Sequence, residues 1–290
     1  MGAPRTGVVI ATRDRAASLL AVLQRLRALP EGPPVVVVDN GSTDGTPEAV
    51  RAAAPEVVVL EAGRNLGAAA RTLGARALDT PYVAFNDDDS WWAPGALRRA
   101  AELLDAHPRV GLLAARVLVG PAGRLDPTCA AMARSPLPRD ALPGPGVLGF
   151  VACGAVVRRT AYLEVGGFDE RYGIGGEERR LALDLAAAGW GLAYADELVV
   201  HHVPDAGGAP RSGRLRRQAR NDLWSAWLRR PPAAALRESA LVLARLARRE
   251  PATAAQAAAD ALGGARWVAR ERRVVPPLVE QGLRAIDRVG

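Results

Sequence analysis

The sequence contains no lysine, so all 38 of its basic residues are arginines. This absence argues against the phosphate loops in which a conserved lysine contacts the nucleotide. Cysteine is scarce too, since Cys129 and Cys153 are the only two. They are too few for a disulfide framework and lack the spacing of a metal site. We predict that both cysteines are packing residues.

Long apolar segments are also missing. The longest candidate, residues 146–157, contains glycines and is shorter than the roughly 20 residues that a membrane-spanning helix needs. The first residues lead into a strand-like run without the basic and then apolar pattern of a secretory signal. These features predict a cytoplasmic protein. The 290 residues, of which 49% are hydrophobic, can form one large domain with a smaller appendage.

Short β-branched runs alternate with helical segments in the first half of the chain. We predict strands over 7–11, 34–38, 57–61 and 82–86, and helices over 16–29, 47–54, 67–78 and 94–105. Uninterrupted valines, as in 35–38, are typical of strands buried on both faces of a parallel sheet. The pattern predicts an α/β fold with a mostly parallel sheet flanked by helices. Further strands are expected over 110–113, 116–119, 147–157 and 192–195, a helix over 177–188, and a long loop over 126–145.

Much of the net charge of +7 comes from arginines beyond residue 210. We therefore divide the whole chain into two predicted units, a catalytic domain over 1–205 and an arginine-rich helical extension over 206–290. The extension reads as helices over about 212–230, 233–249, 252–271 and 277–289. Trp224 and Trp227 lie at helical spacing, which favours docking on the first unit. Peripheral contact with the inner face of a membrane, or a homodimer formed through these helices, is a second interpretation.

Three consecutive aspartates, Asp87, Asp88 and Asp89, follow the strand predicted over 82–86. Crowded carboxylates repel one another, so such a cluster either stays open to water or holds a divalent cation. In open α/β sheets, ligands bind at the carboxyl ends of strands. Asp39 ends another strand in the same way, and its carboxylate can accept the ring N–H of a nucleobase. A solvated loop that caps the next helix is the alternative for the aspartates.

Several segments, taken in order, resemble the family-two glycosyltransferases, which are inverting enzymes of the GT-A fold. They are Val8–Arg15, Val37–Gly45, Arg64–Arg71, Asp87–Asp89 and the acidic region from Gly166 to Glu178. The resemblance implies nucleotide-sugar contacts from Ala11, Thr12, Arg13, Asp39, Asn65, Gly67, Arg71, Asp87 and Asp88. It also implies that Asp87 and Asp89, with a histidine, hold Mn²⁺ or Mg²⁺.

The same resemblance places Glu177 and Glu178 at the catalytic acidic pair, with Glu178 as the general base. The family usually reads Glu-Asp there, often with another aspartate two positions on. This chain has Glu178 and then Arg180 at those places. Glutamate keeps the carboxylate, whereas we assign no role to Arg180.

His201 and His202 follow the apolar run 198–200, and successive strand residues face opposite ways. We therefore expect one of them at the metal, and predict His201. Trp91 and Trp92 follow the aspartates and are predicted to form a wall for sugar or acceptor. Packing against the sheet is their alternative role.

The resemblance predicts transfer of a hexose or deoxyhexose from a UDP-, dTDP- or GDP-linked donor. The acceptor is a saccharide, a lipid-linked saccharide or a small natural product, and no nucleic-acid partner is expected. A metal would neutralise the departing diphosphate while Glu178 takes the acceptor proton. One alternative is a non-catalytic nucleotide-sugar-binding relative, for which Arg180 is the indication. A nucleotidyltransferase is the other, and the absence of lysine argues against it.

Overall fold

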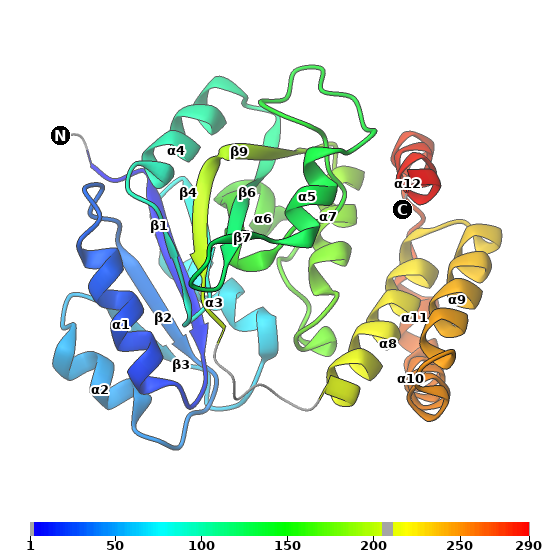
Figure 1. Ribbon diagram of the computed structural model, residues 1–290, viewed down its shortest axis with the longest axis horizontal. Helices are drawn as coiled ribbons and strands as arrows, with labels where there is room; N and C mark the ends of the chain where they lie inside the picture. Colours follow the sequence, from blue (N-terminus) through cyan, green and yellow to red (C-terminus); the bar gives the residue numbers. More distant parts are fainter. Residues whose placement is uncertain (1–2, 205–210, 290) are drawn as a thin grey trace.

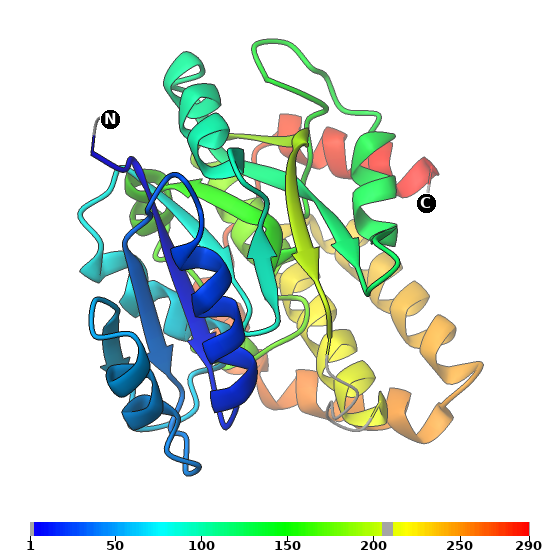
Figure 2. The same cartoon turned by 60° about the vertical axis from the view of Figure 1, so that its left-hand side comes forward.

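The computed structural model describes residues 3–204 and 211–289. A nine-stranded sheet has the order β3-β2-β1-β4-β8-β6-β9-β5, with β7 paired to β6. The strands are β1 (Thr6–Thr12), β2 (Val35–Asp39), β3 (Val58–Glu61), β4 (Tyr82–Asn86), β5 (Ser90–Trp92), β6 (Val110–Val119), β7 (Arg124–Leu125), β8 (Ala155–Arg158) and β9 (Gly191–His202). Strands β1 to β4 are parallel, and β8 runs antiparallel to both β4 and β6 (Figure 2). The carboxyl ends of β1, β2 and β4 therefore meet at one edge.

Helices flank this sheet and the remaining helices gather beside it (Figure 1). Those of the first part are α1 (Ala16–Arg27), α2 (Thr46–Ala53), α3 (Ala70–Ala77), α4 (Ala96–Ala106), α5 (Pro127–Ala133), α6 (Arg159–Glu164) and α7 (Glu177–Ala187), with short 3-10 turns η1 (Gly67–Ala69), η2 (Ala152–Gly154) and η3 (Glu170–Tyr172). The valines of β2 from Val36 to Val38 are buried, as expected for a strand covered on both faces. The predicted α/β fold is confirmed.

Three predictions about the middle of the chain were wrong in detail. Residues 110–119 form one strand rather than two, because no turn residue interrupts them. The strand predicted over 147–157 begins only at Ala155, after the turn η2. The predicted loop 126–145 contains α5, which the Asp126 carboxylate caps by accepting the Thr128 N–H at 2.7 Å. The prolines of that segment favoured a loop prediction, although Asp126 followed by Pro127 is also a regular way to begin a helix.

The C-terminal extension consists of α8 (Arg211–Arg229), α9 (Pro232–Ala247), α10 (Pro251–Gly263), α11 (Ala265–Glu271) and α12 (Pro277–Val289). The single helix predicted over 252–271 is divided at Gly264, where an added Cβ would lie 2.6 Å from the Trp224 indole nitrogen. The boundary predicted between residues 205 and 206 lies outside the described residues. Within 3–204 and 211–289, no helix combines the length and apolar character needed to cross a bilayer.

The extension packs directly on the sheet-containing part. Tyr172 joins Trp224, Leu228 and Val268 in one buried cluster. A second cluster brings Leu183 of α7 against Val275 and Leu283. Both clusters share apolar side chains between the two parts, so the predicted docking of these helices is confirmed. Figure 1 shows α7 lying between the sheet and the C-terminal helices.

Candidate active site

The three aspartates are held by β1 and α1 rather than exposed on a mobile loop. The Thr12 hydroxyl donates to the Asp88 carboxylate at 2.8 Å, and the Ser18 hydroxyl donates to the Asp88 backbone oxygen at 2.8 Å. The Arg15 guanidinium lies 3.3 Å from carboxylate oxygens of both Asp88 and Asp89. Burial raises the pKa of Asp88 to about 6. The alternative of a freely solvated acidic loop does not fit these contacts.

Arg71 of α3 reaches the same place from the opposite side. Its side chain is buried and its guanidinium donates to the Asp87 carboxylate. Burial alone would lower the pKa of Arg71, but the charges of Asp87, Glu177 and Glu178 raise it. Its Nε has no hydrogen-bond partner among the described residues. Arg71 is thus a permanent cation close to both the aspartates and the acidic pair.

Glu177 and Glu178 begin α7 after Gly176, whose φ of 87° lies in the left-handed region. The Glu177 carboxylate is buried and accepts the Gly175 N–H. Glu178 is half-buried as a residue. Burial of its carboxyl group, together with repulsion from Glu177, raises the pKa of Glu178 to about 8. A carboxyl group that titrates near neutrality is suited to accept a proton from a hydroxyl.

The strand register decides which histidine faces the aspartates. In the pairing of β5 with β9, Ser90 lies opposite His202 and Trp91 lies opposite His201. The His202 Nε2 is 3.2 Å from an Asp89 carboxylate oxygen. Burial alone would lower the pKa of His202, but the hydrogen bond to Asp89 and its charge raise it. His201 instead stacks on the Trp91 ring, with 5.4 Å between ring centroids.

The preference for His201 is therefore corrected, because alternation along β9 turns its ring to the other face of the strand. The predicted tryptophan wall is not formed either. Trp92 is fully buried, and Trp91 lies between His201 and Arg25, whose guanidinium carbon is 4.0 Å from its ring centroid. Both tryptophans follow the alternative role of packing.

The predicted nucleotide side lies at the ends of β1 and β2. Asp39 is buried, and its carboxylate accepts the N–H groups of Gly41 and Ser42 at 3.0 and 2.9 Å. These bonds shape the turn after β2, although a carboxylate has lone pairs for a further donor. Ala11 is half-buried near the end of β1. Arg13 is exposed and lies 3.5 Å from Asp14.

A close backbone approach joins the nucleotide side to the acidic loop. Asn65 accepts the Gly67 N–H at 2.8 Å, and Gly67 has a φ of 59°. A Cβ added at Gly67 would lie 2.6 Å from the backbone of Gly173, so only glycine fits here. Asn40, a residue that sequence reasoning missed, holds the same turn by accepting the Leu66 N–H at 3.0 Å. Asn40 follows Asp39 at the end of a strand, and this position in the sequence could have identified it as a site residue.

Cys153, which the sequence analysis predicted only as a packing residue, lies close to the aspartates in the structure. One ligand atom each of Asp87, Cys153 and His202 lies within 4.8 Å of the others. Spacing in sequence gave no sign of this group, because its members come from three separate elements. Arg15 was missed too, although it follows the predicted contact residues of β1 by only a few positions.

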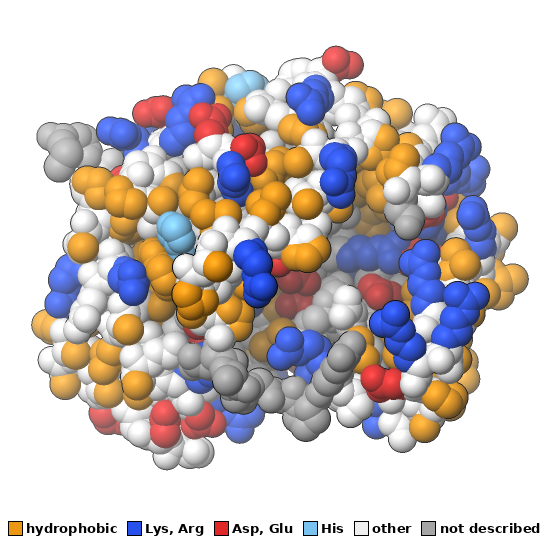
Figure 3. All heavy atoms as spheres, in the orientation of Figure 1, with side chains coloured by type: hydrophobic (Ala, Val, Ile, Leu, Met, Phe, Trp, Pro, Cys, Tyr) orange, Lys and Arg blue, Asp and Glu red, His pale blue; other side chains and the backbone are white. Residues whose placement is uncertain are grey.

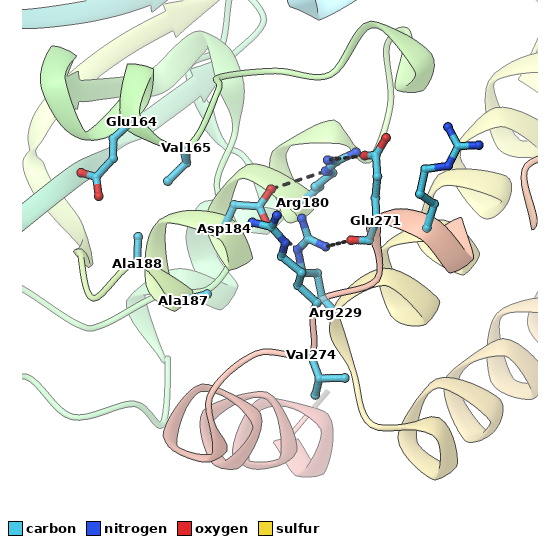
Figure 4. A pocket seen from close by; sticks show the side chains of 11 residues that line it. Glu164, Val165, Arg180, Asp184, Ala187, Ala188, Arg229, Glu271 and Val274 are labelled. Carbon is cyan, nitrogen blue, oxygen red and sulfur yellow. Dashed lines mark hydrogen bonds and ion pairs between the residues drawn. The ribbon is translucent and has the colours of Figure 1, made fainter. Parts of the chain in front are cut away.

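Arg180 belongs to a different cluster. Its guanidinium pairs with Asp169. It also lies 3.4 Å from Asp184 and 3.7 Å from Glu271, both drawn in Figure 4. A cavity of about 600 Å³ opens at this junction of α7 with the extension. Its lining, within the described part of the chain, includes none of the predicted site residues. On the face drawn in Figure 3, a hollow containing acidic and basic side chains separates the sheet part from the C-terminal helices.

Comparison with known proteins places this site in a family. Residues 7–166 match the family described as Glycosyl transferase family 2. The chain belongs to this family. As a member of glycosyl transferase family 2, it is a glycosyltransferase, which disfavours the nucleotidyltransferase alternative.

Two curated relatives of this glycosyltransferase come from Mycobacterium tuberculosis. The chain is 30% identical over 240 residues to N-acetylglucosaminyl-diphospho-decaprenol L-rhamnosyltransferase, covering 68% of this chain and 77% of that protein. It is 32% identical over 205 residues to pre-mycofactocin glycosyltransferase, covering 67% of this chain and 42% of the relative.

Solved structures confirm the GT-A fold. The mannosyltransferase PcManGT from Pyrobaculum calidifontis, in complex with GDP-Man and Mn²⁺, has a TM-score of 0.59 and 22% identity over 99% of this chain and 87% of its own. TarS 1-349 from S. aureus, in complex with UDP-GlcNAc, has a TM-score of 0.64 and 17% identity over 84% and 73% of the two chains.

Proposed function

We propose that this glycosyltransferase is an inverting, metal-dependent enzyme that moves a sugar from a nucleoside-diphosphate sugar to an acceptor hydroxyl. The observation that carries the proposal is the position of Arg71. Its buried guanidinium contacts Asp87 and lies in the field of Glu177 and Glu178. The residues proposed for the leaving group and those proposed for the acceptor thus belong to one site.

Asp87, Asp89 and His202 would hold a divalent metal. His202 Nε2 is 3.2 Å from Asp89, and an oxygen of Asp87 lies within 4.8 Å of a His202 nitrogen. Carboxylate and imidazole together suit Mn²⁺, and the mannosyltransferase relative was solved with that ion. When bound, the metal supplies Lewis-acid neutralisation of the departing diphosphate. Arg71 adds a fixed positive charge on the same side.

Glu178 is proposed as the general base, positioned at the first turn of α7. Its raised pKa keeps the carboxylate basic enough to take the proton of an attacking hydroxyl. A single displacement with one base inverts the anomeric centre. Arg180 takes no part, because its guanidinium is engaged by Asp169 and Asp184. Its presence therefore does not by itself favour the non-catalytic alternative.

The name of the rhamnosyltransferase supports a proposal for the donor and the acceptor of this protein. Since the chain spans 77% of the L-rhamnosyltransferase at 30% identity, we propose a nucleotide-linked deoxyhexose as donor and a lipid-linked saccharide as acceptor. We also propose that residues 211–289 form part of the acceptor side. In support, the Arg217 guanidinium donates to the Ile174 oxygen at 2.9 Å, in the loop that leads to Glu177.

A donor panel tests the proposal. Nucleotide-linked rhamnose, GDP-mannose and UDP-GlcNAc would each be incubated with Mn²⁺ and a polyprenyl-diphosphate saccharide, and nucleotide release measured. We expect release from one donor, loss of release with chelator, and inverted anomeric configuration of the product by NMR. Asp89→Asn should lose metal-dependent release, whereas Asp79→Asn, an exposed aspartate before the amino end of β4 and thus at the opposite edge of the sheet, should not.

Two outcomes would contradict the proposal. Donor binding without release from any of the three, measured with acceptor present, would favour the non-catalytic relative. Product with retained configuration would exclude a single displacement with Glu178 as base.

A further inference from the structure

The described chain contains two buried cysteines whose surroundings differ. The Cys129 sulfur accepts the Val117 N–H at 3.3 Å and donates to the Ala115 oxygen at 3.4 Å. Cys153 is 1% exposed, and its sulfur has no hydrogen-bond partner in residues 3–204 and 211–289. The Cys129 sulfur is therefore occupied by backbone partners, whereas the Cys153 sulfur has none and lies near ligand atoms of Asp87 and His202.

The fold brings Cys153 to the aspartates by sheet pairing. Cys153 lies in the turn η2, directly before β8, and β8 runs antiparallel to β4. The start of β8 therefore lies beside the end of β4, where Asp87 follows. His202 ends β9, on the other side of β6 from β8. Three ligand atoms from three elements thus converge within 4.8 Å of one another.

We propose that Cys153 is a further direct ligand of the divalent metal, a thiolate at the buried end of the site proposed for Asp87, Asp89 and His202. This inference rests on the proposed function, in which the metal is held beside Asp87. The Asp87 and His202 side chains keep part of their surface open, so a metal could enter on their side. Coordination would break the S–H bond, form a metal–sulfur bond and release the proton to solvent.

A thiolate changes which metals the site prefers. Carboxylates alone favour hard ions such as Mg²⁺, whereas sulfur favours softer ions such as Co²⁺, Zn²⁺ and Cd²⁺. The site should accordingly bind Mg²⁺ poorly and Co²⁺, Zn²⁺ or Cd²⁺ well. Replacing the sulfur with a hydroxyl should reverse part of that preference.

Cobalt spectroscopy tests the proposal on the whole protein without reference to turnover. Metal-free wild type, Cys153→Ser and Cys129→Ser would each be titrated with Co²⁺, with and without UDP. Sulfur bound to cobalt gives a near-ultraviolet charge-transfer band that oxygen and nitrogen ligands do not give. We expect the band in wild type and in Cys129→Ser, and its loss in Cys153→Ser. Circular dichroism of the metal-free proteins would confirm that both variants are folded.

Affinity provides a second measurement, which remains usable if the cobalt band is weak. Calorimetric titration should show Cd²⁺ binding weakened by about tenfold or more in Cys153→Ser, equivalent to about 1.4 kcal/mol. Mg²⁺ binding should be unchanged or improved in the same variant.

The possible failures are distinguishable. Cobalt bound with ligand-field bands but without the charge-transfer band would overturn the cysteine assignment and leave the proposed function standing. Retention of the band in Cys153→Ser would overturn it as well. If no metal bound even with UDP, both this inference and the metal-dependent function would be wrong.

Discussion

At the scale of single residues, Glu178 controls the expected response to pH. A base accepts a proton only when its carboxyl group is ionised, and burial beside Glu177 raises the pKa of Glu178 to about 8. If Glu178 is the proposed base, the enzyme is inactive below that pH, where Glu178 is protonated, so kcat/KM should rise as pH rises through this region. Measured over a pH series at saturating metal, an activity rise completed near pH 5 would contradict the assignment.

Substitution of the same residue separates base chemistry from binding. Glu178→Gln keeps the size of the side chain but removes the base, so kcat should fall by about 10²- to 10⁴-fold with donor affinity little changed. Glu178→Asp should retain more activity, since the family usually has aspartate at this place. Equal loss in both variants, or full activity in the glutamine variant, would show that another group takes the proton.

Which residue types form the site could be predicted from sequence, but which neighbour faces it could not. Asp87 and Asp89 lie where strand-end reasoning placed them. The choice between His201 and His202 depended on the register of β9 against β5, which follows from long-range pairing. The position of Cys153 near Asp87 and His202 could not be predicted from sequence. It depends on the antiparallel insertion of β8 between β4 and β6, which is a property of the assembled sheet.

At the scale of elements, α8 of the extension holds the loop that delivers the acidic pair. The buried Asn221 amide donates to the Tyr172 and Gly175 oxygens at 2.9 and 2.6 Å. Asn221→Ala would remove this donor from the Gly175 oxygen and leave the Tyr172 oxygen with the Arg220 guanidinium, at a cost of about 1 to 3 kcal/mol in unfolding free energy. The loop would also lose its position before Glu177.

Kinetics can distinguish this positioning role from simple destabilisation. At a temperature where Asn221→Ala remains folded, we expect kcat to fall by about tenfold or more with donor binding preserved, because small displacements of a base are costly. Arg214→Ala, an exposed change on the same helix, is the matched control and should behave as wild type. Unchanged kcat in folded Asn221→Ala would remove the positioning role and leave only a stabilising one.

The elements themselves differ in how far sequence patterns specify them. The parallel strands β1 to β4 and helices α1 to α4 were predicted because their apolar periodicity is strong and their turns carry clear glycine signals. The helix α6 was missed, since six residues are too few to establish a period. The break at Gly264 was missed because its cause is a tertiary one, the two indole rings packed over that glycine.

At the scale of the whole molecule, buried ion pairs connect the helices of the extension with one another and with α7. Arg230 is 2% exposed and lies 3.0 Å from Glu238 of α9 and 3.1 Å from Glu280 of α12. Glu238 also pairs with Arg179 of α7. One arginine directly after α8 therefore contributes to a network that reaches α7.

Removing that arginine should destabilise the protein as a whole. Arg230→Ala leaves the buried Glu280 with only the exposed Arg284, and Glu238 with only Arg179, as partners. The expected loss is therefore up to about 3 to 5 kcal/mol, the cost of breaking a buried ion pair. Urea unfolding should show this loss as a lower midpoint with a similar slope, while Arg249→Ala, an exposed arginine, should change little. Because Arg179, which joins this network, follows Glu178 in the first turn of α7, the two parts should unfold in one transition in wild type. Separate transitions followed by tryptophan fluorescence and far-ultraviolet dichroism would instead mean that the extension folds independently of the catalytic part.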